Sequence, residues 1–191
     1  MQFVLASHNQ KKLRELREIL GGLGIEVVPL PDDAPVPEET GDTFEENAHI
    51  KAQSAAAFTG LPALADDSGL CVDALGGAPG VHSARYCEGT DGDRNALLLQ
   101  NMAGQDNRAC RFVCVAACVF PDGRSFTVRG ECQGVLLRQS QGQGGFGYDP
   151  LFFVPEFGCT FADLAPADKN RISHRGRALR QLAETLQAYT T

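Results

Sequence analysis

The sequence predicts an α/β fold: a mixed central sheet flanked by helices, with two lobes and a cleft between them. Strand-length apolar segments alternate with helical segments in the first half of the chain, and two β-rich segments around a Pro-Asp-Gly turn follow. Alternation favours parallel pairing and a hairpin adds antiparallel pairing, so the sheet is mixed. With 191 residues, 43% of them hydrophobic, we expect one domain over residues 1–191 with a full core.

The first half of the chain is predicted to alternate strand and helix. Leucines recur at helical spacing until the Gly21-Gly22 pair, and Thr43 with Glu46 forms the pattern of a capping box. Lys51 is expected at a polar edge of the second helix. The leucine stripe comprises Leu13, Leu16, Leu20 and Leu23. The expected elements are strands over 3–6 and 27–30, a helix over 10–20, a loop over 31–37 and a helix from 43 to about 59.

The second half is predicted to contain the hairpin and a C-terminal helix. Residues 63–65 form a very short strand, which 70–72 continue or pair beside. The further expected elements are a turn over 76–80, a helix over 93–102, strands over 111–120 and 124–131, a flexible segment over 139–147 and an extended segment over 151–154. The last helix begins near Ser173, with an inward stripe of Ala178, Leu179, Leu182, Leu186 and Tyr189.

The charge and the cysteines exclude several classes of protein. The formal net charge of −7 excludes a protein that wraps long DNA or RNA, yet a few Lys and Arg can still hold a small anion. Basic residues follow the first apolar segment too soon for a secretory signal, and no run of about 18 apolar residues exists. The seven cysteines contain no CxxC pair, and we interpret Cys110, Cys114 and Cys118, which share one side of a predicted strand, as small buried hydrophobes. We expect a cytoplasmic protein that binds neither membranes nor nucleic acid polymers.

The first polar cluster follows the first strand and begins the first helix. Backbone N–H groups at a helix N-terminus attract phosphate, Ser7 and Asn9 add hydrogen-bond donors, and Lys12 adds a positive charge. The pattern lacks the glycines of a Walker A loop, and a solvated helix start explains it equally well. The candidate phosphate-binding residues are Ser7, His8, Asn9, Gln10, Lys11 and Lys12.

Two acidic pairs are the candidate metal ligands. Mg²⁺ prefers one or two carboxylates and keeps waters and phosphate oxygens as its other ligands. Glu38 and Glu39 lie before the second helix, where a solvated acidic turn is the alternative. Asp66 and Asp67 follow a short strand. Neighbours on an extended chain point to opposite sides, so one aspartate would face metal and water while the other faces a buried partner.

Two further clusters are suited to a nucleotide base. Residues 144–150 place Phe146 and Tyr148 among glycines, so an aromatic ring can stack on a purine; a surface turn with Phe146 in the core is the alternative. Ser173-His174-Arg175 begins the last helix, with Lys169 one turn upstream. An arginine only donates hydrogen bonds, so it favours a 6-oxo purine over the 6-amino group of adenine.

Taken together, the motifs resemble those of the noncanonical purine nucleoside triphosphate pyrophosphatase family, the inosine/xanthosine triphosphate (dITP/XTP) pyrophosphatases. The resemblance covers almost the whole chain in order. It rests on Ser7-x-Asn9-x-x-Lys12, Glu39-Thr40-Gly41, Phe44-x-Glu46-Asn47-Ala48-x-x-Lys51-Ala52, Ala65 to Leu70, Leu75 to Gly80, Ser83 to Tyr86, Gly144 to Pro150, and Lys169 with Ser173 to Gly176. His8 stands where a glycine is common in the family, and Cys87-Glu88-Gly89 makes the loop after Tyr86 differ locally.

The resemblance implies a homodimer and Mg²⁺-dependent hydrolysis of a nucleoside triphosphate to monophosphate and pyrophosphate, in an active site within the cleft. Asp67 would accept the proton of water and Lys12 would stabilise the leaving pyrophosphate. The implied metal ligands are Glu38 or Glu39 and Asp67. The implied substrate contacts are residues 7–12, Ser68, Phe146, Gly147, Tyr148, Asp149, Lys169, His174 and Arg175. Two other interpretations stay open: a nucleotide sensor without catalysis, and a pyrophosphatase for other modified nucleotides.

Overall fold

The sheet in this computed structural model is mixed, as the sequence predicted. The structure describes residues 2–22 and 24–190, without the side chains of residues 11, 15 and 190; Leu23 lies outside the described residues. Within them, seven strands are ordered β2-β1-β3-β4-β5-β6-β7. Strand β1 pairs in parallel with β2 and β3, whereas β6 pairs antiparallel with β5 and β7. The helices therefore connect parallel strands in the first half, and hairpins follow.

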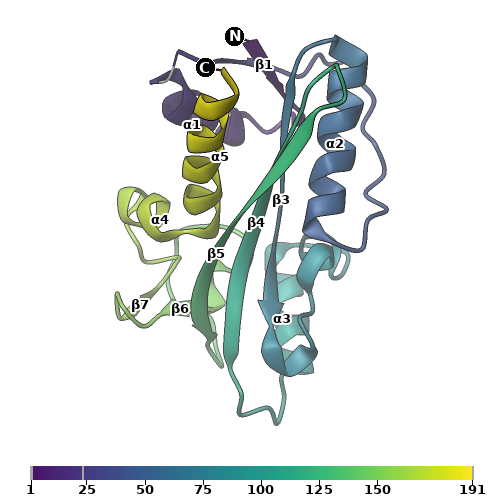
Figure 1. Ribbon diagram of the computed structural model, residues 1–191. Helices are drawn as coiled ribbons and strands as arrows, with labels where there is room; N and C mark the ends of the chain where they lie inside the picture. The colour runs from purple at the N-terminus through teal and green to yellow at the C-terminus, as the bar shows by residue number, and fades with distance from the viewer. Residues whose placement is uncertain (1, 23, 191) are drawn as a thin grey trace. The chain divides into compact units, whose positions relative to one another are not determined.

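The bounds of the elements match most of the expected ranges (Figure 1). The strands are β1 (Gln2–Leu5), β2 (Glu26–Pro29), β3 (Ala63–Val72), β4 (Ala109–Val119), β5 (Ser125–Leu136), β6 (Phe152–Val154) and β7 (Cys159–Thr160). The α-helices are α1 (Gln10–Gly21), α2 (Phe44–Thr59), α3 (Asp91–Asn101), α4 (Pro166–Ile172) and α5 (His174–Thr190). Short 3₁₀ helices cover Asp73–Leu75, Gly80–Arg85 and Asp149–Leu151. Helix α4 and strand β7 are elements that the sequence did not indicate.

The chain divides into two compact units. Unit 1 comprises the described residues of 2–67, 114–130 and 177–190, and unit 2 comprises residues 68–113 and 131–176. Strands β3, β4 and β5 each contribute residues to both units. The single domain of two lobes with a cleft between them stays a prediction.

In unit 1, helices cover the sheet on both faces. Leucines of α1 and α5 pack with Phe3, Leu5 and Leu64 in one core cluster, so these helices share a face of the sheet. Residues of opposite parity, such as Val4 and Ala63, are also buried and point the other way. Helix α2 lies on that second face (Figure 1), with four of its five alanines buried. Both faces of the unit 1 sheet are therefore covered by helices, as is typical of parallel strands.

The ends of α2 are built by the residues that the sequence indicated. Thr43 Oγ1 accepts the N–H of Glu46 at 3.1 Å, and the Glu46 carboxylate accepts the N–H of Thr43 at 3.1 Å. Gly60 ends the helix in the left-handed region with φ 69°. The predicted capping box and stop are confirmed, and they fix the start of α2.

The core of unit 2 contains a cluster of aromatic rings. The Phe112 ring lies 4.6 Å from Phe152 and is parallel to Phe161 at 5.7 Å between centroids. His174 also stacks on Phe112, at 4.7 Å, so the first residue of α5 is anchored on this cluster. Buried Leu98 and Met102 attach α3 to the same core.

Two details of the prediction were wrong. Residues 63–72 form one ten-residue strand, so the acidic pair lies within β3 and not at a strand end. Polar Asp66, Asp67 and Ser68 suggested a break, but ion pairs with lysines allow both carboxylates to be buried inside the strand. Tyr189 was expected in the core, but it is 43% exposed and stacks on Phe126 at the surface.

Candidate functional site

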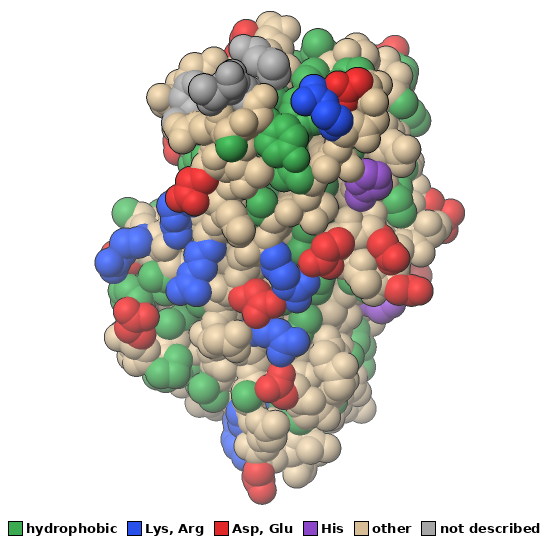
Figure 2. Space-filling view, viewed as in Figure 1, with side chains coloured by type: hydrophobic (Ala, Val, Ile, Leu, Met, Phe, Trp, Pro, Cys, Tyr) green, Lys and Arg blue, Asp and Glu red, His purple; other side chains and the backbone are tan. Residues whose placement is uncertain are grey.

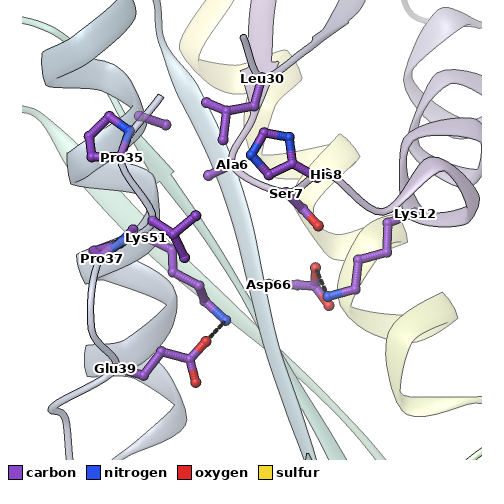
Figure 3. A pocket seen from close by; sticks show the side chains of 12 residues that line it. Ala6, Ser7, His8, Lys12, Leu30, Pro35, Pro37, Glu39, Lys51 and Asp66 are labelled. Atoms are coloured by element: carbon purple, nitrogen blue, oxygen red, sulfur yellow. Dashed lines mark hydrogen bonds and ion pairs between the residues drawn. The ribbon is translucent and has the colours of Figure 1, made fainter. Parts of the chain in front are cut away.

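A cavity of about 260 Å³ lies in unit 1, beside the carboxyl ends of β1 and β2 and the acidic part of β3 (Figure 3). Parallel strands bring their following loops to the same edge, where α/β proteins commonly bind ligands. Both charged and apolar side chains line the cavity. The lining residues are Ala6, Ser7, His8, Lys12, Leu30, Pro35, Val36, Pro37, Glu39, Lys51, Ala55 and Asp66.

The turn after β1 presents the N-terminus of α1 to this cavity. Asn9 Oδ1 accepts the N–H of Lys12 at 3.3 Å, and Ser7 Oγ accepts the N–H of Asn9 at 3.1 Å. These two bonds cap the helix start. Ser7, His8 and Lys12 line the cavity, whereas Gln10 is exposed and the Lys11 side chain lies outside the described residues.

The adjacent aspartates of β3 point to opposite faces, as expected for neighbours on a strand. Lys12 Nζ lies 2.7 Å from Asp66 Oδ1, and Lys51 Nζ lies 3.1 Å from Asp67 Oδ1. Asp66 and Asp67 are only 7% and 8% exposed. Each buried carboxylate therefore has its own lysine, one from α1 and one from α2.

Of the two glutamates, Glu39 belongs to this group. Glu39 Oε1 lies 2.9 Å from Lys51 Nζ and lines the cavity. Glu38 is exposed and is not among the lining residues. Lys51 thus bridges Glu39 and Asp67, and Figure 3 shows its side chain reaching Glu39 from α2.

Burial and charge shift the pKa values of this group. Burial raises the pKa of the Asp67 carboxyl above its ordinary value, and the Lys51 ammonium offsets only part of that shift. Burial lowers the pKa of Lys51, but the carboxylates of Asp67 and Glu39 outweigh it and raise the pKa overall. Asp67 is thus a carboxylate of increased basicity beside a lysine that stays charged.

The donor set of unit 1 fits a hard divalent cation. Asp67 Oδ2 is buried and has no hydrogen-bond partner among the described residues. Glu39 Oε1 and Asp67 Oδ1 both lie within 3.1 Å of Lys51 Nζ. The Lys51 ammonium therefore supplies a positive charge to both carboxylates. Within the described part of the chain, no three acidic, His or Cys side chains gather as a complete metal cage. One or two carboxylates suit Mg²⁺, which keeps water and phosphate oxygens as other ligands.

In unit 2, the glycine-rich segment 144–150 holds an exposed aromatic ring. Phe146 is 61% exposed, whereas Tyr148 is buried and donates from its hydroxyl to the carbonyl of Ser83 at 2.8 Å. Asp149 Oδ2 accepts the N–H of Phe146 at 2.9 Å. Gly145 has φ 75°, and a Cβ there would lie 2.3 Å from Asp149 Oδ2, so only glycine fits. The alternative that placed Phe146 in the core is excluded.

Lys169, from α4, joins this segment to the start of α5. Its Nζ pairs with Asp149 Oδ2 and lies 4.8 Å from the Phe146 ring centroid. Ser173 Oγ accepts the N–H of Gly176 at 3.1 Å, so Ser173 caps α5 as predicted. His174 and Arg175 are half-buried beside it. Unit 2 therefore gathers Phe146, Asp149 and Lys169 at one place, while Ser68 is half-buried in β3.

Lys51 is the site residue that sequence reasoning missed. It was placed at a polar edge, yet only 17% of its side chain is exposed. The signal was the excess of carboxylates: Glu39, Asp66 and Asp67 need more than one cation if they are buried. Lys51 is the lysine of α2, and it was the available counter-ion.

Two further observations concern the charges at the surface and the lengths of the helices. On the face shown in Figure 2, Lys and Arg side chains are interspersed with Asp and Glu. No helix within residues 2–22 and 24–190 is long and apolar enough to cross a membrane.

Relatives with known names match nearly the full chain. A protein of Symbiobacterium thermophilum named dITP/XTP pyrophosphatase is 55% identical, over 98% of this chain and 95% of its own. One of Thermus thermophilus with the same name is 52% identical, over 96% and 91%.

Solved structures and a family pattern agree. A HAM1 protein from Coxiella burnetii superimposes with a TM-score of 0.94 at 45% identity, covering 98% of this chain and 99% of its own. A nucleoside-triphosphatase / dITP/XTP pyrophosphatase from Mycobacterium abscessus gives 0.81 at 44% identity, covering 95% and 97%. The pattern of the Ham1 family matches residues 3–185. The chain therefore belongs to the Ham1 family.

Proposed function

We propose that this chain hydrolyses inosine, deoxyinosine and xanthosine triphosphates to the monophosphate and pyrophosphate, and so cleanses the nucleotide pool. The observation that carries the proposal is a pair of lysine–aspartate contacts at β3, Lys12 with Asp66 and Lys51 with Asp67. Both lysines and Asp66 line one cavity, whereas Asp67 is not among its lining residues. Relatives about half identical to the chain are named for this activity.

The triphosphate is bound by the α1 turn and two lysines. The N-terminus of α1 offers backbone N–H groups and a positive dipole end, and Ser7 and Asn9 lie beside them. Lys12 and Lys51 line the same cavity, so two cations oppose the charge of the phosphates. His8 completes the polar wall.

Mg²⁺ is the cofactor that the carboxylates suit. Glu39 and Asp67 would hold it, whereas exposed Glu38 is less suited. When bound, the metal offsets the charge that develops on the phosphate oxygens.

The reaction is attack of water on the α-phosphorus. Asp67 takes one proton from the water as the oxygen–phosphorus bond forms, and the bond from the α-phosphorus to the bridging oxygen breaks. Pyrophosphate leaves with the electron pair of that bond, and Lys12 stabilises its charge. The raised pKa of Asp67 makes it a better proton acceptor than an ordinary aspartate.

The base is bound by residues of unit 2. Phe146 offers an exposed ring for stacking, and Lys169 and Asp149 lie beside it. Gly147 and Tyr148 shape the loop, and His174 and Arg175 read the 6-oxo edge. Ser68 contacts the substrate next to Asp67.

A panel of nucleoside triphosphates with Mg²⁺, analysed for products, tests the proposal. We expect pyrophosphate and the monophosphate from inosine and xanthosine triphosphates, with much less product from adenosine triphosphate. Tight binding without pyrophosphate release would support the sensor, and preference for pyrimidine or other modified nucleotides would support the third interpretation. The homodimer and the cytoplasmic location stay predictions, and light scattering of the purified chain tests the first.

A further inference from the structure

Two side chains of helix α3 form hydrogen bonds with the backbone N–H and the backbone carbonyl of Gly147. Asp91 Oδ2 accepts the N–H of Gly147 at 2.7 Å, and Asn95 Nδ2 donates to its carbonyl at 3.1 Å. Asp91 and Asn95 are four residues apart, so they lie on one face of α3. Side chains of a single helix therefore occupy both backbone polar groups of one glycine in the loop 144–150.

The geometry at Gly147 separates its two aromatic neighbours. Gly147 has φ 61°, a left-handed conformation that glycine adopts without strain. On one side Tyr148 turns into the core, and on the other Phe146 stays 61% exposed. An exposed ring on a loop fixed by several hydrogen bonds is pre-organised for a partner.

Burial of the Asn95 side chain carries a free-energy cost that packing alone does not explain. Asn95 is 8% exposed, and its Oδ1 is buried with no hydrogen-bond partner among the described residues. A buried acceptor without a donor destabilises a fold, so an apolar side chain would suit this position better. The hydrogen bond from Asn95 Nδ2 to the Gly147 carbonyl is the interaction that offsets this cost.

Asp91 is itself held in place. Arg94 pairs with Asp91 Oδ1 at 2.7 Å through one nitrogen and donates to the carbonyl of Gly89 at 3.0 Å through another. The hydrogen bonds from Arg94 and from the Gly147 N–H lower the pKa of Asp91, so this carboxylate stays charged at neutral pH. A charged acceptor makes a stronger bond to the Gly147 N–H than a neutral one.

We propose that Asp91 and Asn95 are positioning residues for base recognition: they clamp Gly147 so that Phe146 presents its ring to the purine. The proposal rests on the proposed function for its substrate. The clamp acts on base binding and not on the phosphates, because both contacts are made to the loop that carries Phe146.

Steady-state kinetics of three alanine variants test the clamp. We expect Asn95→Ala and Asp91→Ala each to raise the KM for inosine triphosphate about tenfold, since each loses one hydrogen bond to Gly147, with kcat changed less than about twofold. Inhibition by inorganic pyrophosphate, which has no base, stays unchanged. Asn101→Ala is the matched control, because Asn101 is on the same helix and donates to the Tyr86 hydroxyl instead.

A conservative variant and a measurement without turnover separate positioning from folding. Asp91→Asn keeps an oxygen that accepts the Gly147 N–H, so it restores most of the affinity lost in Asp91→Ala. Hydrogen exchange of peptides covering 144–150 increases in Asn95→Ala and stays as in the wild type in Asn101→Ala. Unchanged exchange of this loop, or equal losses of nucleotide and pyrophosphate affinity, overturns the clamp. A wild-type chain that releases no pyrophosphate overturns the proposed function instead, while the exchange result still decides the clamp.

Discussion

Units 1 and 2 both place lysine beside aspartate, but they use the pair differently. In unit 1, Lys51 bridges Asp67 and Glu39, and Asp67 keeps a buried oxygen without a hydrogen-bond partner among the described residues. In unit 2, Asp149 Oδ2 accepts the Phe146 N–H and also pairs with Lys169. The first carboxylate has capacity left for chemistry, whereas the second is committed to the backbone of its own loop.

This difference indicates a division of labour. A carboxylate that holds a loop contributes to where a ligand lies, so its loss affects affinity. A carboxylate with an unused buried oxygen can accept a proton or bind a cation, so its loss affects the chemical step. Substitutions of matched type in the two units therefore separate the two roles.

The largest effect is expected from Asp67→Asn. It removes the proton acceptor, so kcat falls by about 10²- to 10⁴-fold while the KM for inosine triphosphate changes little. The measurement is pyrophosphate release at saturating nucleotide. Asp149→Asn is the matched variant in unit 2, and we expect it to raise KM with a much smaller loss of kcat. Equal losses of kcat in the two variants would contradict the comparison.

Thermal unfolding controls for misfolding of Asp67→Asn. The folded-state pKa of Asp67 lies above its unfolded value, so its contribution to stability is full below the unfolded pKa and is lost as the pH rises through the folded pKa. At neutral pH the ionised carboxyl is therefore a cost to the fold. Without metal, the asparagine variant should unfold at or above the wild-type temperature, and a clearly lower temperature would make its inactivity uninformative.

A change in pH dependence is expected from Lys51→Met. The Lys51 ammonium lowers the pKa of Asp67 against the effect of burial, so its removal raises that pKa further. Activity that requires ionised Asp67 is lost as the pH falls through this pKa, so the acidic limb of kcat/KM moves to higher pH. At neutral pH, kcat/KM falls about 10²-fold because a cation for the phosphates is also lost. Lys169→Met, in unit 2, should leave the acidic limb in place.

The sequence predicted the elements that local rules govern. The capping box at Thr43 and the cap at Ser173 depend on a few neighbouring residues, and both are present in the structure. The mixed sheet followed from alternation of strands and helices. Continuity of β3 through Asp66 and Asp67 was missed because it depends on lysines 54 and 16 residues away.

The candidate site was predicted as a set of clusters and not as contacts. The α1 turn and the 144–150 loop were recognisable from residue type and glycine content. Lys51, Asp91 and Asn95 were not, because their roles depend on partners that only the tertiary structure brings near. A helix face with one lysine or one asparagine has no distinctive pattern in a single sequence.

A smaller effect is expected from Arg175→Ala. If Arg175 donates to the 6-oxo group, its loss weakens discrimination between inosine and adenosine triphosphates by about 1–3 kcal/mol. The ratio of kcat/KM for the two nucleotides measures it. The turnover number for inosine triphosphate should change little, since the arginine belongs to unit 2. An unchanged ratio would remove Arg175 from the base-reading residues.

The smallest effect concerns the reactivity of the cysteine thiols, and its test needs no substitution. Burial raises the pKa of Cys118 in unit 1 and of Cys110 in unit 2 to about 12, so almost no thiolate forms at pH 8. Half-buried Cys87 and Cys159 both belong to unit 2. A thiol reagent should therefore label two cysteines of the native chain quickly, both in unit 2, and all seven in denaturant. Cys114 and Cys118 are buried, and a closed core leaves no route for the reagent. Fast labelling of either cysteine, found by peptide mapping, would show that the sheet of unit 1 opens more readily than its two helical layers suggest.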